Sequence, residues 1–424
     1  MKKQHPMIET LLRLKGNPRA CVYTEPLWGI PFNLYAPYVS LYMYALGVND
    51  VQIGLVTSIG MVFQILFAFL GGAITDKLGR KRTTFIFDII SWSIPCLIWA
   101  FAQNFVFFVV AAIINSTWRV TSNSWMCLMV EDADQDKLVG IYAWVYISGL
   151  LAAFFSPIAR FFIERYELVP TVRVLYLVAF IMMTSKFVIL NRYCTETRQG
   201  RIRMAETRNQ SIFSILGQYG GVLKKLIHSP ATLLTMGIMV VMNICNTVNG
   251  AFWPIMVTQR LRIPVENVAI FPAVKSGIML LLYFFLVPRL SALKFKKPML
   301  LGFGMFIASQ LLLISIPEQG YLLLLVSVFL EACSLSLISP LMDSLSVIMV
   351  DARERARIMA ILHVVIIAFV SPFGWIAGVL SELNRALPFI MNIFLFALGG
   401  IFTYYASRVV NGKKSAVDAT DMGA

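Results

Sequence analysis

Long apolar segments alternate with short polar ones along almost the whole chain. Each apolar segment holds roughly twenty residues, the length that an α-helix needs to cross a bilayer core of about 30 Å. Since most connections are short, we expect sequential helices to be antiparallel. The pattern therefore predicts an all-α polytopic membrane protein. It places twelve transmembrane helices at 25–46, 51–74, 83–102, 105–130, 139–163, 172–193, 229–258, 268–289, 298–316, 320–350, 358–380 and 388–408.

One polar connection is much longer than the others and divides the predicted helices six and six. It begins with a basic stretch and continues with apolar side chains spaced among Gly, Gln and Lys. This composition favours a linker followed by an amphipathic helix at the inner membrane surface. The predicted parts are a cytoplasmic N-terminal segment at 1–24, an N-terminal six-helix bundle at 25–193, a cytoplasmic linker at 194–228, a C-terminal six-helix bundle at 229–408 and a cytoplasmic tail at 409–424.

Composition and charge agree with this topology. The chain is 58% hydrophobic and only 14% charged. Its net charge of +14 could suggest a nucleic-acid partner, but Lys and Arg concentrate in alternate loops, which is the asymmetry that marks cytoplasmic loops. We therefore expect no nucleic-acid partner and a multi-pass protein of a bacterial cytoplasmic membrane, with both termini in the cytoplasm. The six cysteines are scattered without a CxxC pair, so we expect no disulfide, metal site or cofactor.

A charged loop follows the second predicted helix. Residues 72–82 read GAITDKLGRKR and satisfy the pattern G-x3-D-[RK]-x-G-x-[RK]-[RK]. Gly72 permits close helix approach and Gly79 a tight turn, while Asp76 can accept from N–H groups at a helix N-terminus. A stop signal made of basic residues would explain the cations, but not the acid with its two glycines. The pattern resembles the loop between helices 2 and 3 of the major facilitator superfamily.

That resemblance implies two six-helix bundles and secondary transport by alternating access. In the family, the matching acid holds the start of helix 11, here near Arg357. The matching arginine, Arg80, pairs with an acid after helix 4, for which Glu131 and Asp132 are the candidates. The second half of the chain lacks this acid and glycine, so we expect only the first half to form the latch.

Polar side chains near the predicted mid-membrane level indicate a substrate site. Charges there are costly and usually face a cavity or a partner. Arg119 lies near the centre of helix 4 and Glu331 near the middle of helix 10. In the resembled family helices 1, 4, 7 and 10 line the cavity, and our substrate and coupling candidates lie on them. They are Tyr35, Tyr38, Asn115, Arg119, Asn123, Asn243, Asn246, Asn249, Trp253 and Glu331.

Each candidate also has a structural interpretation. Arg119 can be satisfied by helix carbonyls, Glu331 can be a neutral hydrogen-bonded acid, the asparagines can join helices and the tyrosines can pack. Four other charges lie toward helix ends or on helices expected at the periphery or the domain seam, where snorkelling or internal ion pairs suffice. These are Asp88, Arg160, Lys186 and Lys275.

We find no P-loop and no HExxH or GxSxG motif, so ATP-driven pumping and standard hydrolysis lack support and we expect no enzyme. The hypothesis is a monomeric secondary transporter in the lipid bilayer that exports small amphipathic organic compounds in exchange for protons, with Glu331 as proton carrier. Uptake of an organic anion, favoured by Arg119, is one alternative. A transporter-like scaffold or sensor without transport is another, although the polar midplane argues against it.

Overall fold

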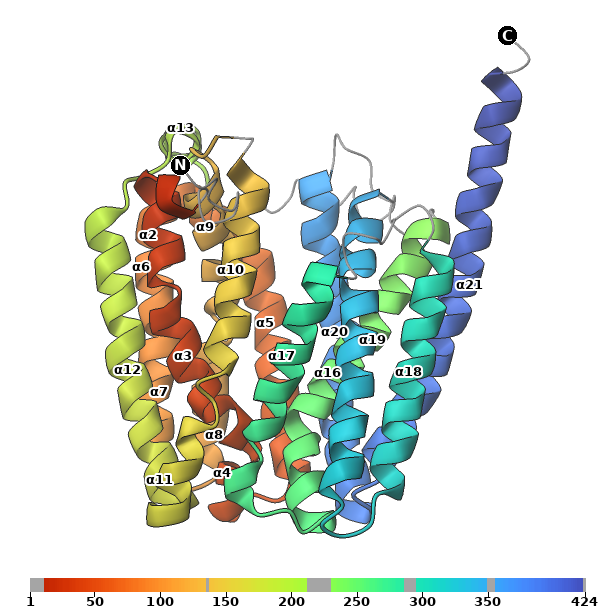
Figure 1. The fold of residues 1–424 in the computed structure, drawn as a ribbon. Coiled ribbons are helices and arrows are strands. Elements are labelled where there is room, and N and C mark those ends of the chain that lie inside the picture. Colours follow the sequence, from red (N-terminus) through yellow and green to blue (C-terminus); the bar gives the residue numbers. More distant parts are fainter. Residues whose placement is uncertain (1–10, 135–136, 212–229, 286–294, 349–354, 422–424) are drawn as a thin grey trace, which may run out of the picture. The chain divides into compact units, whose positions relative to one another are not determined.

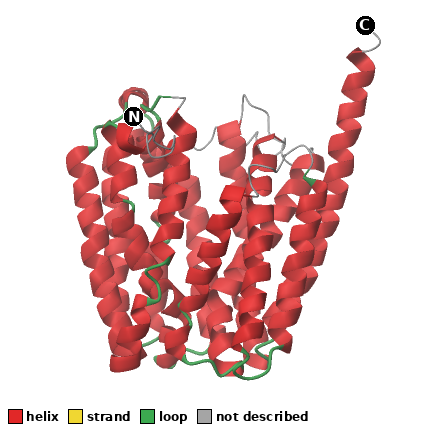
Figure 2. Ribbon diagram, in the orientation of Figure 1, coloured by secondary structure: helices red, strands yellow, loops and turns green. Residues whose placement is uncertain are grey.

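The computed structural model describes residues 11–134, 137–211, 230–285, 295–348 and 355–421. Within these ranges every regular element is a helix, as Figure 2 shows. Eleven helical runs among them are long and apolar enough to cross a membrane. They are Asp50–Leu78, Arg80–Ala100, Phe105–Val130, Gly140–Tyr166, Leu168–Tyr193, Thr232–Arg260, Val265–Phe285, Lys296–Ser315, Tyr321–Met342, Ile361–Leu383 and Leu387–Arg408. The predicted all-α polytopic fold is confirmed.

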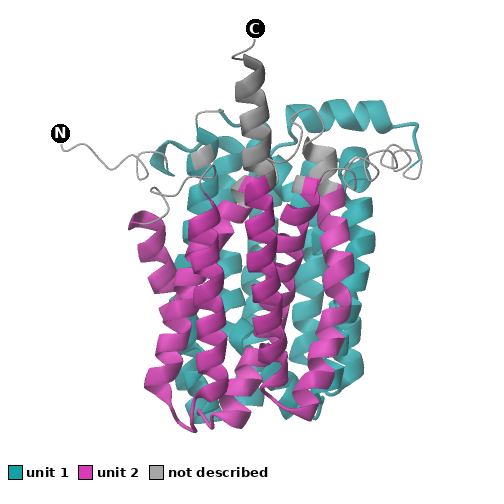
Figure 3. Cartoon of the chain, turned by 90° about the vertical axis from the view of Figure 1, so that its right-hand side faces the viewer, with its two compact units in different colours: residues 1–218, 264–273 teal, residues 219–263, 274–424 magenta. Residues whose placement is uncertain are grey.

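The chain forms two compact units (Figure 3). Unit 1 comprises residues 1–218 and 264–273, and unit 2 comprises residues 219–263 and 274–424. The helices of unit 1 are α2 (Gly16–Thr24), α3 (Pro26–Tyr35), η1 (Ala36–Tyr38), α4 (Val39–Ala45), α5 (Asp50–Leu78), α6 (Arg80–Asp88), η2 (Ile89–Ser93), α7 (Ile94–Ala100), α8 (Phe105–Asn115), α9 (Trp118–Val130), α10 (Leu138–Ala153), α11 (Ile158–Tyr166), α12 (Leu168–Tyr193), α13 (Arg198–Thr207) and η6 (Val265–Asn267). Unit 2 holds α16 (Pro230–Ile255), η5 (Met256–Arg260), most of α17 (Ile270–Phe285), α18 (Lys296–Ser315), α19 (Tyr321–Ile348), α20 (Arg355–Leu383) and α21 (Leu387–Asp421).

The first predicted transmembrane helix is a broken run. It passes from α3 through the 3₁₀ turn η1 to α4. Pro37 lies in η1, where it has no backbone N–H to donate, so the regular α-helical ladder cannot continue through it. This broken run is not among the eleven.

The third membrane span contains a π-helical turn. Helix α6 ends at Asp88, η2 adds a wider turn, and α7 completes the span. Such turns shift helix register and free carbonyls, and they often occur at functional sites. Here Asn115 Nδ2 donates to the Ser91 carbonyl at 2.7 Å, so a side chain from α8 stabilises the widened turn.

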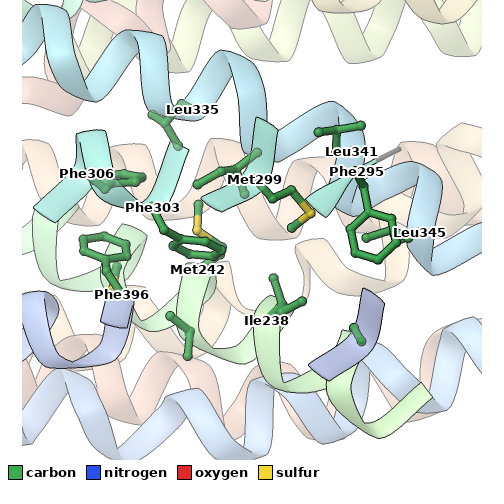
Figure 4. Packing of buried hydrophobic residues seen from close by; sticks show 14 residues of the cluster. Ile238, Met242, Phe295, Met299, Phe303, Phe306, Leu335, Leu341, Leu345 and Phe396 are labelled. Carbon is green, nitrogen blue, oxygen red and sulfur yellow. The ribbon is translucent and has the colours of Figure 1, made fainter. Parts of the chain in front are cut away.

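Unit 2 has an aromatic and aliphatic core between α16, α18, α19 and α21 (Figure 4). The rings of Phe306 and Phe396 stack with centroids 4.1 Å apart, and Met242 and Met299 fill the space beside them. Close packing of this kind fixes the helices of the unit against one another.

Two segments that we placed outside the N-terminal six-helix bundle, one before it and one after it, pack against its helices. Leu14 and Cys21, which we had assigned to the cytoplasmic segment, are buried against α9, α10 and α12. The polar stretch where we predicted only a linker forms α13, which packs on α5. The amphipathic helix predicted after it lies outside the described residues.

Candidate functional site

The loop between α5 and α6 gathers a cluster of charges at one end of unit 1. Gly79 has φ 86° and ψ 163°, a conformation open in practice only to glycine. This turn brings Arg80 between two acids: its Nη2 lies 3.1 Å from Glu131 Oε1 and its Nη1 lies 3.1 Å from Asp76 Oδ1. The guanidinium is therefore held by both carboxylates.

The segment around α13 completes this cluster. Arg203 Nη2 lies 2.8 Å from Asp76 Oδ2, and this hydrogen bond raises the pKa of Arg203. Glu196 accepts from the backbone N–H groups of Arg80 and Lys81, both at 3.0 Å. Glu196 thus caps the N-terminus of α6, where the helix dipole favours an anion. Figure 1 shows α13 lying across this end of unit 1.

A cavity of about 400 Å³ opens within unit 1. Its lining comes from the start of α3 and from α6, η2, α9 and α12, which pack together as Figure 1 shows. The lining is aromatic, with three titratable groups. It comprises Glu25, Trp28, Phe32, Asp88, Trp92, Trp118, Thr121, Ser122, Trp125, Lys186 and Phe187.

A buried ion pair forms part of this lining. Lys186 Nζ lies 2.7 Å from Glu25 Oε2, and the two side chains are only 6% and 12% exposed. The same ammonium lies 5.4 Å from the ring centroid of Trp125 and 5.9 Å from that of Trp28. Both distances fall within cation–π range, so two rings and one carboxylate surround the ammonium.

A second acid lies in the same cavity. Asp88 is buried, and Thr121 Oγ1 donates to its carboxylate at 2.7 Å. The rings are ordered by one another: Trp28 stacks on Phe32 at 4.8 Å, and Trp92 meets Trp28 edge-on at 5.0 Å. Contacts of this geometry hold the aromatic walls in place.

Unit 2 contains a different buried network. Lys275 Nζ lies 2.6 Å from Glu331 Oε1, with the lysine 29% and the glutamate 8% exposed. Asn249 Nδ2 donates to the same oxygen at 3.4 Å, and Asn392 Nδ2 donates to Asn249 Oδ1 at 3.0 Å. One lysine and one amide therefore contact the carboxylate, and a second amide bonds to the first.

Comparison with known proteins gives the family. A sequence model described as Major Facilitator Superfamily matches residues 28–374. The chain belongs to the major facilitator superfamily. No curated protein matches the chain.

Solved structures of transporters share the fold. The nucleoside transporter NupG superposes with a TM-score of 0.67 at 15% identity, covering 94% of this chain and 99% of the other. A POT family transporter in complex with 5-aminolevulinic acid gives 0.66 at 15% identity, covering 93% and 96%. The human organic anion transporter MFSD10 gives 0.66 at 14%, covering 94% and 100%. At this identity the likeness establishes the fold: twelve helices in two six-helix bundles.

Within this major facilitator fold, some of the predicted site residues lie together. Glu331 and Asn249 share the network in unit 2. Of the two acids proposed for Arg80, Glu131 is the partner, whereas the Asp132 carboxylate accepts from the Arg198 N–H. The side chain of Arg357 lies outside the described residues, so the predicted contact of Asp76 with helix 11 stays a prediction.

Other predicted residues lie apart from the cavity lining. Arg119 Nε donates to Gln64 Oε1 at 3.0 Å, and its guanidinium lies 4.0 Å from the ring centroid of Trp118. Tyr35 and Tyr38 are buried; the Tyr35 ring packs against Tyr176, and the Tyr38 hydroxyl donates to the Glu266 carbonyl at 3.3 Å. Along the helices, Asn115 bonds to η2, Trp253 is half-buried, and the exposed asparagines are Asn123, Asn243 and Asn246.

The unit 1 cavity escaped the sequence analysis. We assigned Asp88 and Lys186 to snorkelling or structural pairs, and Glu25 to the edge of the first helix. The available signal was the presence of an acid and a lysine inside otherwise apolar spans, together with tryptophans on the same spans. Their convergence depends on how four helices pack, which the one-dimensional pattern does not encode.

Proposed function

We propose that this protein is a secondary active transporter that exports small amphipathic organic compounds in exchange for protons. The single observation that carries the proposal is the aromatic cavity of unit 1 with its buried charges. Ligand sites are commonly cavities of about 300–1,000 Å³ lined by apolar and aromatic side chains with a few placed polar groups. The lining described above has this character.

Proton coupling is assigned to Glu331. A carboxylate buried in a membrane protein is costly and typical of proton relays. Its partners are one ammonium and a neutral amide. Protonation would remove the charge that holds Lys275, so the network has two distinct states. A coupling proton drives transport only if it binds these states with different affinity.

Arg119 supports a second candidate, uptake of an organic anion. Its hydrogen-bond partner is the neutral amide of Gln64. Among the described residues no carboxylate lies within ion-pair distance of this guanidinium. A half-buried arginine without a compensating acid suits a substrate carboxylate or sulfonate.

The test uses everted membrane vesicles with an acidified interior and a pH-sensitive dye. Amphipathic cations, neutral compounds and organic anions are added one class at a time. Proton efflux triggered by amphipathic compounds and abolished by Glu331→Gln is expected. The matched control is Glu318→Gln, since Glu318 is exposed in the turn between α18 and α19, and it should transport as the wild type does.

Other outcomes separate the alternatives. Release of preloaded anions from these everted vesicles, lost in Arg119→Ala, would replace export by anion uptake, because the vesicle interior corresponds to the outside of the cell. If none of the three compound classes is transported although folded protein is present in the vesicles, transport would be rejected and a scaffold or sensor favoured.

A further inference from the structure

The cavity of unit 1 carries an ammonium group that belongs to the protein itself. Lys186 enters from α12 and places its Nζ on Glu25 and near the rings of Trp28 and Trp125. Carboxylate and aromatic faces are the two groups that recognise organic cations. We propose that the cavity is a binding site for a protonated aromatic amine, and that Lys186 is its tethered competitor.

The charge balance of the lining favours a cation. The lining holds two carboxyl groups, Glu25 and Asp88, and one amine, Lys186. Thr121 donates a hydrogen bond to Asp88, which compensates part of the desolvation of that carboxylate but adds no charge. With both carboxyl groups ionised, a bound monocation neutralises the lining, whereas an anion would add to an uncompensated negative charge in a medium of low polarity.

The geometry leaves room for a ligand larger than the lysine tip. The Nζ lies 5.4 Å and 5.9 Å from the two ring centroids, near the outer limit of about 6 Å for cation–π attraction. The cavity of about 400 Å³ extends beyond it. An amine with an aromatic body can place its ammonium on Glu25 or Asp88 and its ring against the tryptophans, while Lys186 shifts to the other acid.

Arg119 does not oppose this assignment. Its side chain is bonded to Gln64 of α5 and stacks on the Trp118 ring. It is not among the residues that line the cavity. The inference deepens the proposed function and rests on it only for the statement that the bound amine is transported.

Binding is tested at equilibrium with the full chain in lipid nanodiscs, using three ligands of one shape. They are 1-naphthylmethylammonium, 1-naphthalenemethanol and 1-naphthoate, with empty nanodiscs subtracted. We expect the ammonium to bind wild-type protein about tenfold more tightly than the alcohol, a difference of about 1.4 kcal/mol, and the anion to bind most weakly. Equal affinity for ammonium and alcohol, or preference for the anion, overturns the proposal.

Variants test the role of each charge. Glu25→Gln should weaken ammonium binding about tenfold and leave alcohol binding within about twofold, because only the charged ligand uses the carboxylate. Lys186→Met should tighten ammonium binding about tenfold, since the competitor is gone. The control Lys137→Met removes a lysine that is also paired, with Asp134, but at the surface, and should change neither affinity.

Two results would contradict the competitor role. One is ammonium binding that weakens in Lys186→Met, and the other is an equal change in Lys137→Met. If Lys186→Met does not fold, the wild-type preference among the three ligands still decides the ligand class. Ammonium binding without transport in the vesicles would reject the proposed transport but support the binding site. Transport without a preference for the ammonium ligand would reject the binding site but support transport.

Discussion

The described part of each unit contains a Lys–Glu pair with an enclosed glutamate, yet the two pairs have different surroundings. In unit 1 the partners are nearly fully enclosed, and the lysine lies among tryptophan rings beside a second acid, Asp88. In unit 2 the lysine is partly exposed, and the other hydrogen-bond partner of Glu331 is the neutral amide of Asn249. The two pairs consist of the same residue types, but the residues around them differ.

This difference indicates different roles for the two pairs. The unit 1 pair borders an open cavity with one uncompensated acid, so a ligand can enter and exchange with the lysine. The unit 2 acid has its charge balanced by a single ammonium and accepts from one amide, so a proton is the natural exchange partner for that ammonium. We infer that unit 1 supplies substrate recognition and unit 2 supplies coupling.

Removing the lysine of each pair is the strongest test of this difference. Lys186→Met should lower the free energy of unfolding by about 3–5 kcal/mol, because it leaves Glu25 buried without its cation. Lys275→Met should cost less, roughly 1–2 kcal/mol, since the pair in unit 2 is partly hydrated and amide donors remain. Thermal unfolding of the purified variants, followed by tryptophan fluorescence in one detergent, measures both. Equal losses would mean that the surroundings of the two pairs do not matter energetically.

The sequence predicted the fold well and the unit 1 site poorly. Helix length depends on local composition, and the loop at Gly79 is a contiguous pattern. The helices and this loop could therefore be predicted from the sequence. The Asn249–Glu331 contact was within reach because both are polar residues in mid-span. The cavity was not, because Glu25 and Lys186 lie 161 positions apart and meet only through the packing of α3 on α12.

Two structural features, the π-helical turn η2 and helix α13, were not predicted from the sequence. The π-helical turn η2 leaves no compositional mark, yet it sets the register of Trp92 relative to Asp88. Likewise α13 is mostly polar, and its few apolar residues form no long stripe. Its position depends on ion pairs with Asp76, which are tertiary contacts.

Two glycines give the next comparison between the units. A larger residue is disfavoured by backbone conformation at Gly79 of unit 1 and by a neighbouring side chain at Gly302 of unit 2. Gly79→Ala forces a side chain onto a left-handed backbone and brings Cβ 2.5 Å from Glu196 Oε2. Gly302 in α18 has helical geometry, and an added Cβ would lie 2.7 Å from Ile338 Cγ1. We expect a loss of about 1–3 kcal/mol for Gly79→Ala.

The expected cost of Gly302→Ala is smaller, about 1 kcal/mol, because a flexible side chain can move aside. Thermal unfolding gives the total loss, and protease sensitivity of residues 198–208 reports whether α13 detaches. Only Gly79→Ala should expose that segment. Exposure in both variants would show that α13 responds to global stability and not to the charged loop.

A pair of threonines provides the finest test, since both are buried and differ in what they bond. Thr121 donates to the Asp88 carboxylate at 2.7 Å, whereas Thr403 of α21 donates to the Gly399 carbonyl of its own helix at 2.9 Å. Replacing each by valine preserves shape and removes one donor. Thr121→Val should cost about 1–2 kcal/mol because a buried carboxylate loses a hydrogen bond, and Thr403→Val about 0.5 kcal/mol because a helical carbonyl keeps its backbone donor. In the binding assay the first variant should also bind the naphthylmethylammonium more weakly, since the buried Asp88 carboxylate loses a donor that favours its charged form. Equal unfolding losses with unchanged ligand affinity would mean that Asp88 carries no charge in the cavity, and the excess of negative charge that distinguishes unit 1 would disappear.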